Sequence, residues 1–132
     1  MTERALVAIV DDDESHRGAT RSLLRAAGFA TAAFSDAQSF LASAMRGTTA
    51  CLVTDLKMPG MSGIELCEVL AAAGDAIPAV LVTAYSEELT QARARKAGIK
   101  CCLIKPFAAE QLLDCVREAL ATPRSGKPIP KS

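Results

Sequence analysis

The sequence predicts an α/β fold, a doubly wound five-stranded parallel sheet built as (βα)₅. Short apolar runs alternate along the chain with stretches of helical periodicity. The runs lack polar/apolar alternation, which is typical of strands covered on both faces. Five strands with five intervening or following helices indicate one α/β sandwich, because right-handed crossovers place helices on both sides of the sheet.

Five segments are expected to form the strands. Four of them are nearly continuous apolar runs, and the second has a weaker pattern. In such sheets a functional site lies beyond the carboxyl ends of the strands, near the point where the strand order reverses. In chain order the expected strands are Ala5–Val10, Ala30–Phe34, Cys51–Thr54, Ala79–Val82 and Cys101–Ile104.

Helical signals lie between these strands. In the second helix, apolar residues recur at the spacing i, i+3, i+4, i+7, and Ser35 with Gln38 is expected to form an N-terminal capping box. Ser62 and Glu65 form another capping box before a helix over Ile64–Ala73. The recurring residues of the second helix are Ala37, Phe40, Leu41 and Ala44, and those of the last helix are Leu112, Leu113, Val116 and Leu120.

Two helices have weaker patterns. Glu14–Ala27 is expected to bury a face through Ala19, Leu23 and Ala26. Ser86–Ala97 has few apolar residues, so weak packing makes it the helix that moves most easily. The helix ends are marked by glycines, as is common for left-handed C-terminal caps. These glycines are Gly28, Gly74 and Gly98.

Composition limits the class of protein. The 132 residues suit one domain, and a hydrophobic content of 50% excludes disorder. The 15 basic and 15 acidic residues balance, which argues against direct binding to nucleic acid or to a membrane surface. The apolar run near the N-terminus is too short for a signal peptide or a membrane span, so we expect a cytoplasmic protein.

The five cysteines are odd in number and contain no C-x-x-C pair. With a single histidine in the chain, they do not form a recognisable zinc motif. Each lies in an apolar run, and we expect them to be small buried hydrophobic residues in a reducing cytoplasm. They are Cys51, Cys67, Cys101, Cys102 and Cys115.

The last eleven residues differ from the rest of the chain. Residues 122–132 contain three prolines, a glycine and basic residues, with little to bury. Such a composition is typical of a flexible tail or a truncated linker. We therefore expect one folded domain over residues 4–121.

Polar residues gather at the expected carboxyl ends of the strands. Acidic residues Asp11–Glu14 follow the first strand and Asp55 the third, while Thr83 follows the fourth and Lys105 the fifth. Taken singly, each is typical of a loop or of a helix N-terminus. Together they are expected to lie at one rim of the sheet. Two carboxylates ~4 Å apart there would repel each other by about 4 kcal/mol at an effective dielectric of 20. Such a pair requires a bound proton or cation. Hard oxygen ligands favour Mg²⁺, and the whole set suits transfer of a phosphoryl group onto aspartate.

Four motifs occur in a characteristic order. They are VDDD (residues 10–13), LVTDLKMPGMSGIEL (52–66), VTAY (82–85) and KPF (105–107). Through them, the chain resembles the receiver domains of bacterial two-component response regulators. The wording of the second motif is most similar to the FixJ-type subgroup of DNA-binding regulators. The resemblance implies a flavodoxin-like fold with strand order 2-1-3-4-5.

The resemblance also implies residue roles. Asp55 would be the phosphoacceptor. Asp11 and Asp12, together with Asp55 and the backbone carbonyl of Lys57, would hold Mg²⁺, with Mn²⁺ as an alternative ion.

On the phosphoryl side, Thr83 would be the switch hydroxyl. The small Ala84 would leave the phosphoryl oxygens accessible. Lys105 would pair with the phosphate, and the Lys105–Pro106 bond would be cis.

One position departs from the family pattern. Members commonly carry Tyr or Phe three residues before the lysine, whereas this chain has Cys102. A thiol cannot act as a ring rotamer switch. Tyr85, the only tyrosine, could substitute in part, although an ordinary loop aromatic is the favoured interpretation.

The phosphoryl donor would lie outside this chain. His16 is expected to be a solvated helix residue without a catalytic partner. The donor would be the phosphohistidine of a sensor histidine kinase or of a phosphotransfer protein, or a small acyl phosphate. A phosphorylation-dependent homodimer through the 86–121 face is a further expectation.

The sequence leaves two other functions open. A phosphatase with an aspartyl-phosphate intermediate would typically have an acid two residues after the nucleophile, where this chain has Lys57. A binding module without phosphorylation would not need the complete set of polar residues. The domain either acts alone or belongs to a DNA-binding transcriptional regulator.

Overall fold

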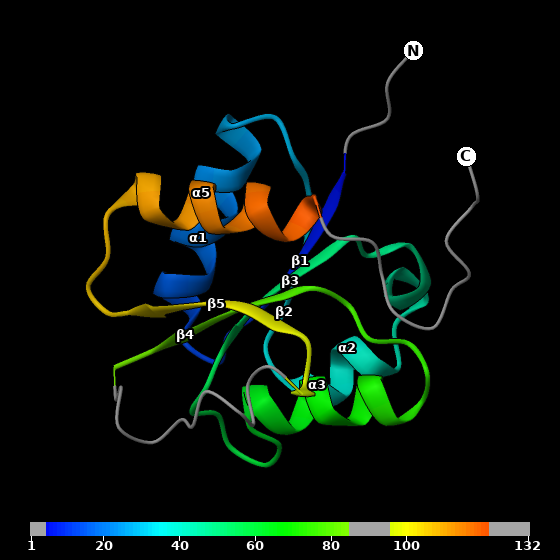
Figure 1. Ribbon diagram of the computed structural model, residues 1–132. Coiled ribbons are helices and arrows are strands. Elements are labelled where there is room, and N and C mark those ends of the chain that lie inside the picture. The colour runs from blue at the N-terminus through cyan, green and yellow to red at the C-terminus, as the bar shows by residue number, and fades with distance from the viewer. Residues whose placement is uncertain (1–4, 85–95, 122–132) are drawn as a thin grey trace, which may run out of the picture.

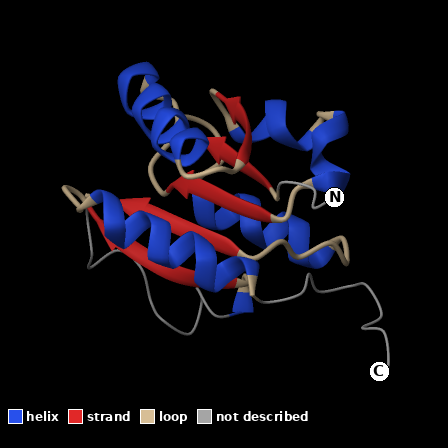
Figure 2. Ribbon diagram, turned by 90° about the horizontal axis from the view of Figure 1, so that it is seen from above, coloured by secondary structure: helices blue, strands red, loops and turns tan. Residues whose placement is uncertain are grey.

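The computed structural model describes residues 5–84 and 96–121. They form three layers, with the sheet in the middle (Figures 1 and 2). Helices α1 (Glu14–Ala26) and α5 (Ala109–Leu120) cover one face of the sheet, and α2 (Ala37–Leu41) and α3 (Gly63–Ala72) cover the other. A 3₁₀ helix over Ala44–Thr48 follows α2. The layered α/β prediction is therefore confirmed.

The sheet has five strands in the order β2-β1-β3-β4-β5. All four neighbouring pairs are parallel, and the order confirms the doubly wound topology. The fifth strand begins two residues earlier than expected. The strands are β1 (Leu6–Val10), β2 (Ala30–Phe34), β3 (Cys51–Asp55), β4 (Ala79–Thr83) and β5 (Ile99–Ile104).

Side chains on both faces of the inner strands β1, β3 and β4 are buried, which explains the continuous apolar runs there. On β1, Val7 and Ile9 pack with α1 and α5, whereas Ala8 and Val10 pack with α2 and α3. Successive strand residues point to opposite faces, so a strand between two helical layers is apolar along most of its length.

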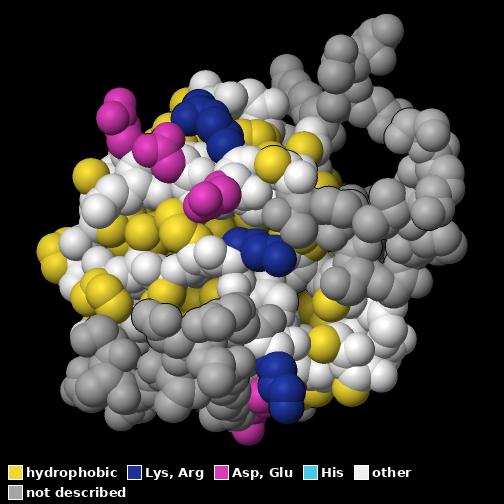
Figure 3. Space-filling model, viewed as in Figure 1, with side chains coloured by type: hydrophobic (Ala, Val, Ile, Leu, Met, Phe, Trp, Pro, Cys, Tyr) yellow, Lys and Arg dark blue, Asp and Glu magenta, His cyan; other side chains and the backbone are white. Residues whose placement is uncertain are grey.

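Some expected segments lie outside the described residues. These are residues 86–95 of the helix expected over Ser86–Ala97, Tyr85, and the tail over residues 122–132. In the part of the chain that is described, no helix has the length and apolar character needed to cross a membrane. On the face in Figure 3, acidic and basic side chains are scattered among apolar and neutral ones, consistent with the zero net charge.

The prediction of which face of α1 is buried was wrong. Thr20 and Leu24 are its buried residues, while Ala19 and Ala26 are exposed and Leu23 is partly buried. Many residues of this helix are small or polar, so the spacing of its few apolar residues did not define how the helix is rotated about its own axis. The helix is placed by Leu24, which packs with the sheet and α5 residues of its core cluster.

The caps of the other helices are partly as expected. The capping box of Ser62 and Glu65 is present at the start of α3. At α2, however, the N-cap is Asp36, whose side chain accepts from the Ser39 backbone N–H at 2.7 Å, and Ser35 does not cap. An ionised Asp is as good a cap as Ser and stands one residue closer to the helix.

The cysteines do not all behave as expected. Cys51 and Cys67 are buried, as predicted, but Cys102 is exposed. Cys101 and Cys115 form a disulfide between β5 and α5. Their Cα atoms lie 5.8 Å apart although 14 residues separate them along the chain, so packing of α5 on the sheet brings them together. The expectation that every cysteine is a buried free thiol is therefore wrong for three of the five.

We expect an alkylating reagent to label only Cys102 in the native, unreduced protein. Burial raises the pKa of the Cys51 and Cys67 thiols to about 12, so both stay protonated and covered at mildly alkaline pH. Mass spectrometry after alkylation should show one labelled cysteine in the native state, three after unfolding and five after unfolding with reductant. Five labelled residues without reductant would disprove the disulfide.

Candidate functional site

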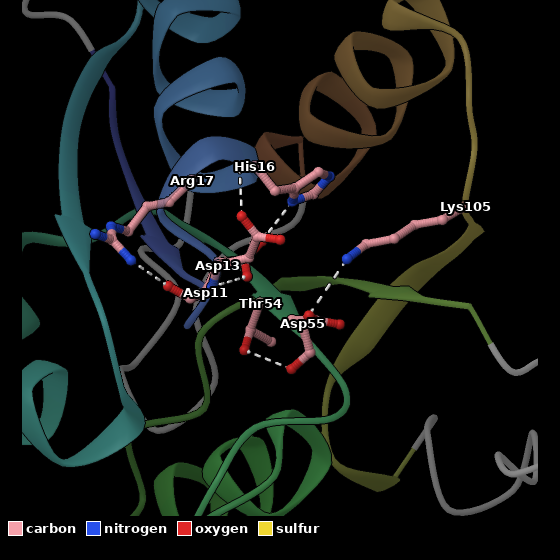
Figure 4. Close-up of polar contacts among 7 residues, drawn as sticks. All are labelled: Asp11, Asp13, His16, Arg17, Thr54, Asp55 and Lys105. Carbon is pink, nitrogen blue, oxygen red and sulfur yellow. Dashed lines mark hydrogen bonds and ion pairs between the residues drawn. The ribbon is translucent and has the colours of Figure 1, made fainter.

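The site lies at the rim formed by the carboxyl ends of the strands. Asp11 follows β1, Asp55 ends β3, Thr83 ends β4 and Lys105 follows β5. The strand order reverses between β1 and β3, so the two central strands bring their terminal carboxylates together (Figure 4). Residues almost a hundred positions apart thus share one small region.

Three carboxylates form a compact cluster. Asp11, Asp12 and Asp55 each offer an oxygen within 4.8 Å of the others. Asp11 is buried, Asp55 is partly buried and Asp12 is exposed. Such a group of hard oxygen donors on an open rim fits Mg²⁺ or Mn²⁺, which prefer carboxylates and retain some of their water.

Lys105 approaches the cluster from the other side. Its Nζ donates to Oδ2 of Asp55 at 3.3 Å (Figure 4). Burial raises the pKa of the Asp55 carboxyl, the Lys105 ammonium opposes this change, and the charges of Asp11 and Asp12 add to the rise. The net direction is upward, which means that ionised Asp55 is held at a cost that a bound cation would relieve.

This raised pKa predicts how stability changes with pH in metal-free buffer. The folded protein holds the Asp55 proton more tightly than the unfolded chain, so the stabilisation from Asp55 is present at low pH. It is lost as pH rises from the ordinary carboxyl range through the raised pKa. Denaturant unfolding with a chelator, compared between wild type and Asp55→Asn, should therefore show wild type losing stability relative to the variant over this range. A relative gain would contradict the assignment.

Other predicted residues lie around the rim. Thr83 is fully buried, and Ala84 after it is exposed. Lys57 is exposed in the loop that follows β3. The Lys105–Pro106 peptide bond is cis.

Of the two residues expected to take part in a switch readout, only Cys102 lies within the described part of the chain. Cys102 is exposed on β5, three residues before Lys105. Tyr85 lies outside the described residues. The structure therefore provides no aromatic ring at the position that Cys102 occupies.

Two residues of the site were not anticipated. His16 was expected to be solvated, but its ring contacts the Asp11 carboxylate through Nδ1, and only 28% of its side chain is exposed. The expectation was wrong because the first turn of α1 folds back over the end of β1. The signal in the sequence was the spacing of five residues between Asp11 and His16, which is not specific by itself.

The second unanticipated residue is Gly63, the first residue of α3. A Cβ at this position would lie 2.2 Å from the backbone carbonyl oxygen of Asp55. The Gly63 N–H also donates to the Leu56 carbonyl at 2.9 Å. Only glycine lets α3 begin so close to the end of β3, and a glycine directly after the capping Ser62 was the available signal.

Comparisons with known proteins agree with this geometry. A family model described as response regulator receiver domain matches residues 7–117. The chain is 37% identical to Nodulation protein W of Bradyrhizobium diazoefficiens over 94% of this chain and 54% of that protein. It is 33% identical to the transcriptional regulatory protein FixJ of the same organism over 100% of this chain and 63% of FixJ.

Solved structures agree as well. The response regulator StyR superposes with a TM-score of 0.84 at 44% identity, covering 90% of this chain and 60% of StyR. FixJ-N superposes with a TM-score of 0.79 at 32% identity, covering 91% of this chain and 96% of that one. The chain thus spans somewhat more than half the length of the curated relatives above, and nearly all of the FixJ-N fragment.

Proposed function

Because this chain belongs to the family of response regulator receiver domains, we propose that it is a phosphorylation-controlled switch with Asp55 as the phosphoacceptor. Receiver domains are components of two-component signal transduction. The observation that carries the proposal is the position of Asp55. It belongs to a cluster of three carboxylates, and its Oδ2 also accepts from the Lys105 ammonium Nζ at 3.3 Å. That arrangement places a nucleophile between a cation site and a fixed positive charge.

In the proposed reaction, a carboxylate oxygen of Asp55 attacks the phosphorus atom of the donor. The new bond joins this oxygen to phosphorus, and the bond from phosphorus to the donor atom breaks with its electron pair. The donor is the phosphohistidine of a sensor histidine kinase or phosphotransfer protein, whose imidazole leaves, or a small acyl phosphate, whose carboxylate leaves. Lys105 then exchanges its contact with Asp55 for one with a phosphoryl oxygen, and the Thr83 hydroxyl donates to another.

The residues that would hold Mg²⁺ are Asp11, Asp12, Asp55 and the backbone carbonyl of Lys57, and Mn²⁺ would fit the same oxygen donors. The ion would supply positive charge to the phosphoryl oxygens as negative charge develops on them. Ala84 leaves space next to Thr83 for the transferred group.

The energy required for switching is available from these contacts. A nearly complete shift between two conformations needs about 5.5 kcal/mol of differential stabilisation. Hydrogen bonds to charged groups contribute about 1.5–3 kcal/mol each, so two or three new contacts to the phosphoryl group suffice. The readout proceeds without an aromatic ring at Cys102, and Tyr85 is the remaining aromatic candidate for that role.

The wider setting is also a proposal. We assign the domain to residues 4–121 and a flexible tail or truncated linker to residues 122–132. Similarity to FixJ favours a receiver that regulates transcription through a DNA-binding domain, and a stand-alone receiver is the alternative. The phosphorylated protein would form a homodimer through the 86–121 face, and binding of nucleic acid would not be a property of these residues themselves.

Phosphoryl transfer from a radiolabelled acyl phosphate tests the function. We expect labelling to reach one phosphoryl group per chain with Mg²⁺ and to remain at background with a chelator. Continued release of phosphate from unrelated phosphate esters would favour a phosphatase instead. Absence of both labelling and Mg²⁺ binding would favour a module that binds without phosphorylation.

A further inference from the structure

The Asp11 carboxylate is engaged at both of its oxygens. Oδ1 accepts from the Asp13 backbone N–H at 2.9 Å, and Oδ2 contacts Nδ1 of His16 (Figure 4). The Asp11 backbone carbonyl accepts from Arg17 at 2.8 Å. Only 3% of Asp11 is exposed, so little water is available to replace a lost partner. The start of α1 thereby determines which way this carboxylate faces.

The His16 ring is itself held in place on its other side. It meets the Phe107 ring edge to face, with centroids 6.0 Å apart and an interplanar angle of 87°. Beyond it lies a cavity of about 400 Å³ between α1 and α5, which His16 lines with Leu23, Phe107 and Leu112 among others. His16 therefore stands between an apolar space and the acidic rim, and its Nδ1 points to the rim.

His16 is not itself a member of the cluster that could hold a cation. In the described parts of the chain, that cluster consists of Asp11, Asp12 and Asp55. Of these, Asp11 is the one most fully buried, and its side chain oxygens have two partners of different kinds. The Asp13 N–H belongs to the backbone, whereas the His16 contact depends on one side chain that substitution can remove.

We propose that His16 is a positioning residue, which holds the Asp11 carboxylate in the orientation that serves the bound divalent cation. This inference rests on the proposed function, since it takes the acidic rim to be a cation site. Groups that hydrogen-bond to ligating side chains orient them, and their loss commonly weakens metal affinity. Without His16, Oδ2 of Asp11 has no fixed partner, and the carboxylate is no longer held in the orientation in which it offers an oxygen to the same cation as Asp12 and Asp55.

The experiment is a calorimetric titration of the full chain with Mg²⁺. We expect His16→Ala to weaken Mg²⁺ binding by about 10–100-fold, the usual range for loss of such a partner. His16→Asn should bind nearly as well as wild type, because the Asn amide nitrogen occupies the position of Nδ1. His16→Gln should resemble His16→Ala, because its amide nitrogen lies one bond further out. Unfolding of each variant in metal-free buffer serves as the folding control.

A kinetic measurement separates positioning from general damage. In labelling with an acyl phosphate, His16→Ala should raise the Mg²⁺ concentration for half-maximal rate and leave the rate at saturating Mg²⁺ close to that of wild type. Equal Mg²⁺ affinity in wild type and His16→Ala would overturn the positioning role of His16 but not the proposed function. Equal weakening in the Asn and Gln variants would overturn it too, because the hydrogen bond would then not matter. Failure of wild type to bind Mg²⁺ would instead overturn the proposed function.

Discussion

Phosphoryl incorporation is expected to fall to background in the Asp55→Asn variant. An amide has the shape of the carboxylate but lacks its negative charge and nucleophilic oxygen, so the acceptor is lost while the packing is kept. Asp55 is partly buried against Lys105, whose Nζ can still donate to the Asn oxygen. The variant should fold, and in metal-free buffer it should be at least as stable as wild type because burial disfavours the ionised carboxylate.

The matched control is Asp13→Asn. Asp13 lies on the same rim, but its side chain caps α1 by accepting from the His16 backbone N–H at 3.1 Å. Asn is an equally good cap, so this variant should keep both stability and labelling. Radiolabelled acyl phosphate with Mg²⁺, followed by separation of the protein from the donor, measures both variants. Equal labelling of wild type and Asp55→Asn would disprove the acceptor assignment.

The second large effect is expected from Gly63→Ala. The new Cβ would overlap the Asp55 carbonyl oxygen, which belongs to the backbone and cannot rotate away. Overpacking of this kind typically costs about 1–3 kcal/mol, and relief requires α3 to move from the end of β3. The clash also pushes on the Asp55 backbone, and a shift there changes the position of the Asp55 side chain relative to Lys105, so both the free energy of unfolding and the rate of phosphoryl acceptance should fall.

Gly18→Ala provides the control for Gly63→Ala. Gly18 lies within α1, and a Cβ there would meet nothing within 4 Å. Alanine at such a position should stabilise the protein by about 0.4–1 kcal/mol, through the lower entropy of the unfolded chain. Denaturant unfolding of the two variants measures the contrast. A Gly63→Ala variant as stable and as active as wild type would show that α3 can start further from Asp55.

Local patterns were sufficient for the strands and for most helices. The run that forms β4 is apolar from Ala79 to Val82 because helices cover both faces of the sheet, and no knowledge of its neighbours is needed to see this. The cap of α3 was equally local, since Ser62 and Glu65 lie three residues apart. Predictions were poorer where local signals were ambiguous, as for the buried face of α1 and the cap of α2.

The candidate site was also predictable in outline. Parallel strands bring their carboxyl ends to one edge, so the order of Asp11, Asp55, Thr83 and Lys105 along the chain already placed them on one rim. The resemblance to receiver domains then supplied their expected roles. Neither source indicated that His16 would contact Asp11, because that contact depends on how the first turn of α1 folds back over β1.

By itself, the sequence determined the (βα)₅ fold and the rim on which the polar residues meet, because both follow from periodicity and from the geometry of parallel strands. The tertiary structure alone decided which side chains touch. It placed His16 against Asp11 and joined Cys101 to Cys115 across β5 and α5. It also placed Gly63 where an added Cβ would lie 2.2 Å from the Asp55 carbonyl oxygen. These contacts depend on the rotation and separation of packed elements to within about an ångström, and local periodicity carries no such information.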